Sequence, residues 1–139
     1  MTQPQPPDVE AIVLDYLLSV TDVTDVFTAE IGTHLDGTVD AQPLPALKFT
    51  QISTIVATHR RLTGYLFQLE AWAGSKVAAF DAMAPVSAAM LDEEAIVGVY
   101  AGLGVVTGTE SAVGPRPAPD PETGTPRYLH DVRVYARAE

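Results

Sequence analysis

The chain has no cysteine, which excludes disulfide bonds, thiolate nucleophiles and metal sites built from cysteine. Basic residues are also scarce. There are 8 Lys and Arg against 18 Asp and Glu, so the formal net charge is -10. Proteins that bind nucleic acid rely on clustered cations that displace counterions from the phosphates. The composition therefore argues against specific binding of nucleic acid.

Long apolar runs are missing as well. No stretch approaches the roughly 18 uninterrupted residues that a membrane helix needs. The opening stretch MTQPQPPDVE has neither the basic nor the apolar region of a signal peptide. We therefore expect no membrane association and no export by that route.

The length of 139 residues and the hydrophobic fraction of 47% fit one packed domain, because two cores of half this size would each be marginal. Residues 1–7 are polar and rich in proline, which predicts a flexible N-terminal tail. Residues 8–139 are expected to form the single domain.

Two stretches have the spacing of amphipathic helices. The first begins at Asp8, a good N-cap, and its apolar residues recur on one helical face: Val9, Ile12, Val13, Tyr16 and Leu17. The second follows Ser75, and we expect it to pack on a sheet through a stripe rich in small residues: Val77, Phe80, Ala84, Ala88 and Leu91. Pro85 removes a backbone donor, which predicts a kink or a break.

Alternating or β-branched stretches predict the strands. A short strand is expected at 26–31, a hairpin at 46–52 and 62–72 with THRR at its tip, and a second hairpin at 95–107 and 128–137. The connection at 109–126 contains five prolines, which favour an extended loop. The predicted fold is α+β, with a mixed or antiparallel sheet of about four to five strands packed by two main helices.

No motif for catalysis, cofactor binding or metal binding is present. The three histidines, His34, His59 and His130, stand far apart without a second ligand at helical spacing. The stretch GLGVVTG misplaces the third glycine of a dinucleotide fingerprint, and a Pro-rich segment follows it where a phosphate-binding helix is needed. We therefore expect neither an enzyme nor a cofactor.

Charge is distributed unevenly along the chain. Residues 1–40 have no Lys or Arg but many acids, which form either a solvated face or a face that meets a basic partner or repels passing DNA. The candidates for a partner-facing or lumen-facing position are Asp22, Asp25, Glu30, Asp36 and Asp40. The candidates for subunit or partner contacts lie at a predicted hairpin tip and around the Pro-rich segment, where their alternative role is solubility: Arg60, Arg61, Arg116, Asp120 and Arg127.

Four stretches are distinctive in their order and composition: DVEAIVLDYLL, LPALKFTQI, YLFQLEAWAGSKVAAFDAM and PDPETGTPRYLHDVRVYAR. Together they resemble the tail-terminator proteins of siphophages, especially those that infect actinobacteria. The resemblance covers roughly residues 8–137. Its most specific part is the last stretch, where a Pro/Gly-rich segment precedes an aromatic residue and an alternating strand. Pro85 departs from the uninterrupted helix expected of this family.

The resemblance implies a mixed sheet covered by helices on one side and a homo-hexameric ring on the last ring of the tail tube. Such a ring stops tube polymerisation and offers the surface that a head-completion or connector protein joins. DNA would only pass through the lumen, and the protein would be located in the virion at the head–tail junction after assembly in the host cytoplasm.

Two alternatives remain open at this point. A head-closure or neck connector protein has similar size, symmetry and acidity, and its binding partner would distinguish it. A small cytoplasmic enzyme or ligand-binding domain would instead be indicated by titratable groups that converge in a deep apolar cavity.

Overall fold

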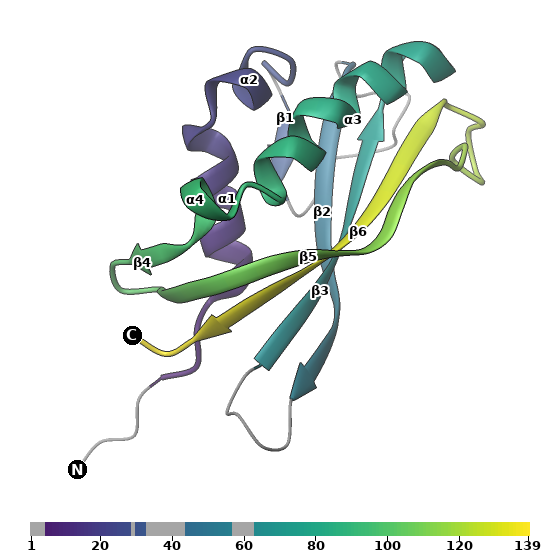
Figure 1. Cartoon of the computed structure of the whole chain (residues 1–139). Coiled ribbons are helices and arrows are strands. Elements are labelled where there is room, and N and C mark those ends of the chain that lie inside the picture. Colours follow the sequence, from purple (N-terminus) through teal and green to yellow (C-terminus); the bar gives the residue numbers. More distant parts are fainter. Residues whose placement is uncertain (1–4, 29, 33–43, 57–62) are drawn as a thin grey trace.

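The computed structural model describes residues 5–28, 30–32, 44–56 and 63–139. The chain forms an α+β fold (Figure 1). Its helices are α1 (Val9–Ser19), α2 (Thr21–Thr24), α3 (Lys76–Met90) and α4 (Glu93–Ile96). Its strands are β1 (Glu30–Gly32), β2 (Ala46–Val56), β3 (Thr63–Trp72), β4 (Gly98–Tyr100), β5 (Gly104–Pro117) and β6 (Arg127–Arg137).

All strands in the described part of the chain belong to one 6-stranded sheet with the order β1-β2-β3-β6-β5-β4. The sheet is mixed, because β1 pairs parallel with β2 whereas every other pairing is antiparallel. The predicted hairpin of β2 and β3 is confirmed, although its THRR tip lies outside the described residues. The predicted last strand, β6, is confirmed, and it pairs antiparallel with β5. The predicted strand at 95–107 was wrong as a single strand, because this stretch contains the end of α4, the strand β4, a turn and only the first residues of β5. The short strand β4 accounts for the larger strand count.

One face of the sheet carries the core. Residues of β2, β3 and β6 that share this face, such as Phe49, Phe67 and Val132, join the buried side chains of all four helices in one hydrophobic cluster. We call this the core face. The helices therefore lie on a single side of the sheet (Figure 1). The opposite face, which we call the outer face, is not covered by any described helix.

Helix α1 matches its prediction. The carboxylate of Asp8 accepts a hydrogen bond from the backbone N–H of Ala11, and the buried residues are the predicted apolar ones. The hydroxyl of Tyr16 donates to the carbonyl of Ala89 at 2.6 Å, which links α1 to the end of α3. Burial, with the nearby charge of Asp92, raises the pKa of Tyr16 to about 12, so this donor keeps its proton.

The prediction for the buried face of α3 was wrong. The side chains that face the sheet are Ala79, Ala82, Met83, Val86, Ala89 and Met90, whereas the predicted stripe points outward. Both faces of this helix are apolar, so helical spacing alone could not distinguish them. The helix does not break at Pro85, since α3 is one continuous helix from Lys76 to Met90.

The predicted strand at 26–31 was wrong for residues 26–28, which follow the helical turn α2 and form no strand. It was right for Glu30 and Ile31, which belong to β1, and residue 29 lies outside the described residues. Val23 and Phe27 are both buried. Their spacing of four places them on one side of a helical turn, and this burial outweighs the preference of β-branched residues for extended backbone.

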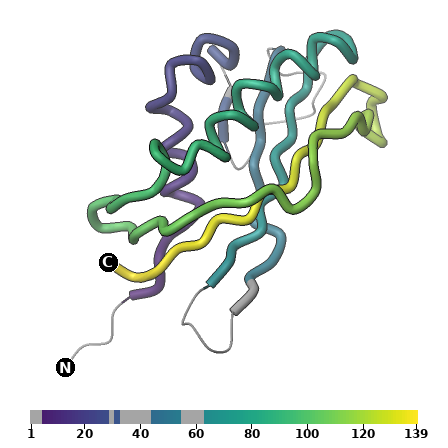
Figure 2. Tube along the Cα trace, viewed as in Figure 1, coloured from purple at the N-terminus to yellow at the C-terminus, as the bar shows by residue number. Residues whose placement is uncertain are grey.

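The predicted loop at 109–126 needs a similar correction. β5 continues to Pro117 and pairs with β6 through Arg116 and Leu129 and through Pro117 and Tyr128. Proline is tolerated on an edge strand, where its missing N–H is not needed for pairing. Three register shifts accommodate the irregular backbone. Figure 2 shows the resulting long ribbon of β5 and β6 reaching toward the N-terminal end of α3.

Candidate assembly surfaces

An apolar surface runs along the solvent side of α3. We call it the α3 stripe, and it consists of the residues first expected to face the sheet: Val77, Phe80, Ala84, Ala88 and Leu91. Val77 is 69% exposed, Phe80 52% and Leu91 39%. The spacing of these residues places them along one line of the helix. Exposed apolar side chains gathered on one side of a helix make this surface a candidate for contact with a protein.

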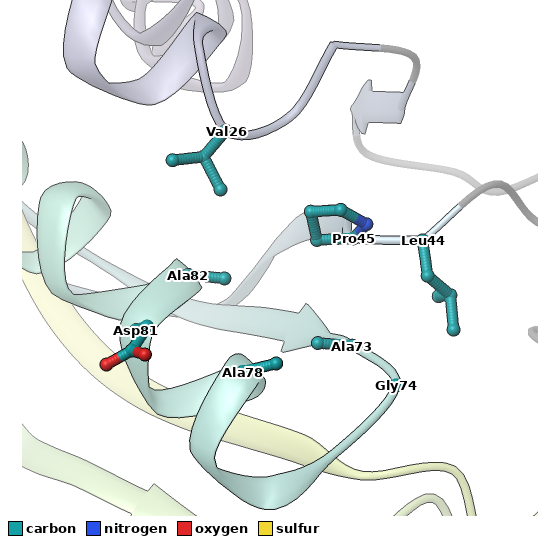
Figure 3. Close-up of a pocket in the computed structure, with 8 residues that line it drawn as sticks. All are labelled: Val26, Leu44, Pro45, Ala73, Gly74, Ala78, Asp81 and Ala82. Carbon is teal, nitrogen blue, oxygen red and sulfur yellow. The ribbon is translucent and has the colours of Figure 1, made fainter.

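Two shallow hollows flank the N-terminal half of the α3 stripe. One, of about 400 Å³, is bounded by Lys76, Val77, Phe80 and Tyr128, where the rings of Phe80 and Tyr128 meet edge to face with centroids 5.5 Å apart. The other, of about 440 Å³, opens between α3 and the start of β2, and Val26 and Pro45 face Ala78 and Ala82 across it (Figure 3). The hollows extend the apolar surface to both sides of the helix.

The helical side of the molecule is acidic. Exposed acids on or beside the helices include Asp15, Asp22, Asp25, Asp81 and Glu94. Lys76 is the single basic residue within the described helices. The outer face of the sheet instead carries most of the described basic side chains. Charge is therefore separated between the two sides of the subunit.

The most buried of the described ion pairs on the outer face joins β3 to β6. The Arg127 guanidinium lies 3.0 Å from the Glu70 carboxylate, and both side chains are largely buried. It also donates from Nε to the carbonyl of Ala118 and lies over the Trp72 ring. Burial raises the pKa of Glu70, while Arg127 and Lys48 oppose that shift. Arg127 is therefore the nearby charge that most favours the ionised form of Glu70.

The tip of the β5–β6 ribbon is fixed by Asp120. Its carboxylate accepts backbone hydrogen bonds from Glu122 and Thr123 and a third from Nε1 of Trp72. Burial acts to raise the pKa of Asp120, but these hydrogen bonds and Arg127 hold it below its ordinary value. The tip is thus an ordered turn attached to the end of β3.

The structure brings three of the predicted interface residues, Arg116, Asp120 and Arg127, together on the ribbon. Each is engaged within its own chain, since Arg116 contacts Asp131 at 3.2 Å and the other two form the contacts given above. These pairs favour a role in holding the ribbon. Arg60 and Arg61 lie outside the described residues.

Of the predicted acidic residues, Asp22 and Asp25 are exposed on and just after α2. Asp36 and Asp40 lie outside the described residues. Glu30 begins β1, but its side chain is outside the described part of the structure. The structure therefore places two of the five at the surface of the acidic helical side.

Sequence reasoning missed a buried polar link between α3 and the ribbon. Nδ1 of His130 lies 2.7 Å from the Ser87 hydroxyl of α3, and Nε2 lies 2.8 Å from the Ser111 hydroxyl of β5. A neutral imidazole has one donor and one acceptor nitrogen, which matches two hydroxyl partners. Burial lowers the pKa of His130, Asp131 opposes the shift, and Arg116 adds to it.

From the burial of this histidine we predict that its protonation lowers the free energy of unfolding as the pH drops below about 6.5. Because the pKa of His130 is lowered in the folded protein, the unfolded chain binds more protons in that window, and protonation favours unfolding. The slope should not exceed about 1.4 kcal/mol per pH unit. Urea denaturation between neutral and mildly acidic pH measures it. His130→Gln keeps a donor and an acceptor but does not titrate, so an identical slope in this variant would contradict the assignment.

The hollows beside α3 have few titratable side chains among their described lining residues. Asp81 is the one in the larger hollow, and Lys76 and Tyr128 are the two in the smaller one. Across the described residues there is no group of three or more His, Asp or Glu side chains placed to hold a metal ion. No described helix is both long and apolar enough to span a membrane.

No protein-family model matches the chain, and a search among curated proteins finds no match either.

Proposed function

We propose that this protein is a tail terminator, a virion protein that assembles into a homo-hexameric ring on the end of a siphophage tail tube. The ring stops tube polymerisation and presents the surface that a head-completion or connector protein joins. The protein acts through its interfaces and without catalysis.

The observation that carries the proposal is the exposed α3 stripe. Val77, Phe80 and Leu91 are large apolar side chains, and the fold leaves them exposed on the solvent side of α3. Burying a Phe side chain is favourable by about 1.5–3 kcal/mol. An exposed row of such residues supports a role in which a protein partner covers them.

Two further observations support the same reading. The mixed sheet with helices on one side agrees with the architecture that the sequence resemblance implies. The acidic helical side suits a subunit that stands near DNA without retaining it, because binding to phosphates needs clustered cations. In the ring, that side faces either the lumen or a basic surface of the tube protein.

A capping assay tests the proposal. The purified protein, added to polymerising tail-tube protein of the cognate phage, should appear at one end of each tube in electron micrographs and arrest growth at that end. Tubes that grow at an unchanged rate, with the protein bound to the portal-side adaptor instead, would replace the terminator with a head-closure or neck connector. Binding to neither would remove both.

A further inference from the structure

The two ends of the sheet share an unusual feature. The outermost strands, β1 and β4, are each three residues long and pair only with residues 46–48 of β2 and 104–106 of β5. In the described part of the chain, no strand pairs with the outer edge of β2 beyond Lys48 or of β5 beyond Val106. Each long strand therefore presents a row of backbone N–H and C=O groups at an opposite end of one sheet.

The open part of β5 has few of the features that prevent edge pairing. Residues 107–114, TGTESAVG, contain no Lys or Pro. Their single charge, Glu110, already contacts Arg133 and Tyr135 within the same sheet. Residues that hinder pairing with another strand appear only at the end of β5, where Pro115 and Pro117 lie. Bulges within this stretch twist the edge but do not supply a pairing partner.

The open part of β2 has the matching character. Residues 49–56, FTQISTIV, contain neither a charged residue nor proline. Ile52 is 48% exposed, and Val113 on the β5 edge is 46% exposed. The low charge of these edges matters for a chain with a net charge of -10, because two such subunits repel each other least where one edge has no ionised side chain and the other has only Glu110, which is paired with Arg133. Backbone pairing requires no opposite charge at all.

The directions of the strands also fit. β2, β3, β6 and β5 alternate in direction across three antiparallel pairings, so β5 runs opposite to β2. Rotation about an axis along the strands preserves strand direction. The β2 of a rotated copy would therefore meet β5 in antiparallel orientation. Because the two edges differ, the contact is head-to-tail. Such a contact does not end at a dimer, and it builds a ring when the rotation between copies closes.

From these observations we infer that copies of this chain join edge to edge, with residues 107–114 of β5 pairing antiparallel with residues 49–56 of β2 in the next copy. The inference rests on the proposed function, which makes the partner at each edge another copy of this chain in a ring of more than two subunits. It adds the interface that builds the ring and leaves the α3 stripe free for the protein that the ring meets.

Cross-linking tests this interface directly, because the natural chain has no cysteine. Ser53→Cys in β2 and Ala112→Cys in β5 are exposed positions on the two edges. A chain with both changes, treated with a short bis-maleimide in the assembled state, should give a ladder of covalent oligomers that extends to the full ring. Either single variant should give none. A covalent dimer from Ala112→Cys alone would overturn the inference in favour of pairing between two β5 edges.

A substitution gives the second measurement. Ala112→Lys places a charge on the β5 edge and should weaken self-association at least tenfold. A tenfold change corresponds to about 1.4 kcal/mol. Ala101→Lys, at an exposed alanine in the β4–β5 turn, is the matched control and should assemble as the natural chain does. Unfolding midpoints of both variants confirm that each is folded.

The outcomes separate the inference from the proposed function. A ring that forms without a ladder, and that tolerates Ala112→Lys, overturns the edge-to-edge contact and leaves the ring standing. A chain that stays monomeric both alone and with the tail-tube protein overturns the ring and the edge contact together.

Discussion

Replacing Phe80 with aspartate is expected to remove assembly with the tail tube while leaving the subunit folded. Phe80 is 52% exposed, and it belongs both to the α3 stripe and to the lining of the hollow beside Tyr128. Aromatic side chains at the centre of an interface commonly contribute 2 kcal/mol or more. Aspartate also introduces a charge that the contact must desolvate. We expect binding to weaken by about a hundredfold or more.

Leu18 provides the matched control. It is an exposed apolar residue of α1, at 51%, but it does not belong to the α3 stripe. Leu18→Asp should therefore assemble normally. Co-sedimentation of each variant with preformed tubes measures binding, and thermal unfolding verifies the fold. If the two variants bind equally well, the α3 stripe is not the contact surface.

Replacing Arg127 with methionine is expected to lower the free energy of unfolding by about 3 kcal/mol, the size typical of breaking one side of a buried ion pair. Glu70 would then be buried without its cation. Methionine keeps much of the apolar volume, so the loss reflects mainly the unpaired carboxylate. Denaturation with urea measures the effect.

The same variant should show a characteristic pH dependence. Burial already raises the pKa of Glu70 and Arg127 opposes that shift, so removal of Arg127 raises the pKa further. A group whose pKa is raised in the folded state contributes stability at low pH that is lost as the pH rises. The loss of unfolding free energy in Arg127→Met should therefore be largest above neutral pH. It should be smaller near about pH 5, closer to the pKa of an ordinary carboxyl group.

The double variant Arg127→Met with Glu70→Gln completes the comparison. It removes both charges and should recover most of the lost stability, because a buried pair replaced by neutral groups is often tolerated. A deficit that is independent of pH and persists in the double variant would mean that Arg127 acts through its packing on Trp72.

Sequence reasoning reached the fold class and most of the long elements because their signals are local. The N-cap Asp8, the apolar spacing of α1 and the alternation in β3 each follow from neighbouring residues. The orientation of α3 did not follow, because alanines and larger apolar residues occupy both of its sides. Which side faces the sheet depends on the depth available beneath the helix, and small residues such as Ala79 and Ala82 permit the closer approach.

The contacts around the ribbon were beyond local reasoning for a different reason. Glu70 and Arg127 are 57 positions apart, and the pairing of β3 with β6 brings them together. Ser87 and His130 are 43 positions apart, and the packing of α3 on the sheet brings them together. The prolines of the ribbon misled the prediction because their effect depends on position. On an outer edge they leave the pairing with β6 intact.

The central claim is that this chain works as a ring on a tail tube, and native mass tests it most directly. Light scattering after size-exclusion chromatography would be recorded for the purified protein alone and with its cognate tail-tube protein. The proposal predicts a hexamer, either by itself or once tube protein is present. A monomer whose mass is indifferent to tube protein would contradict it.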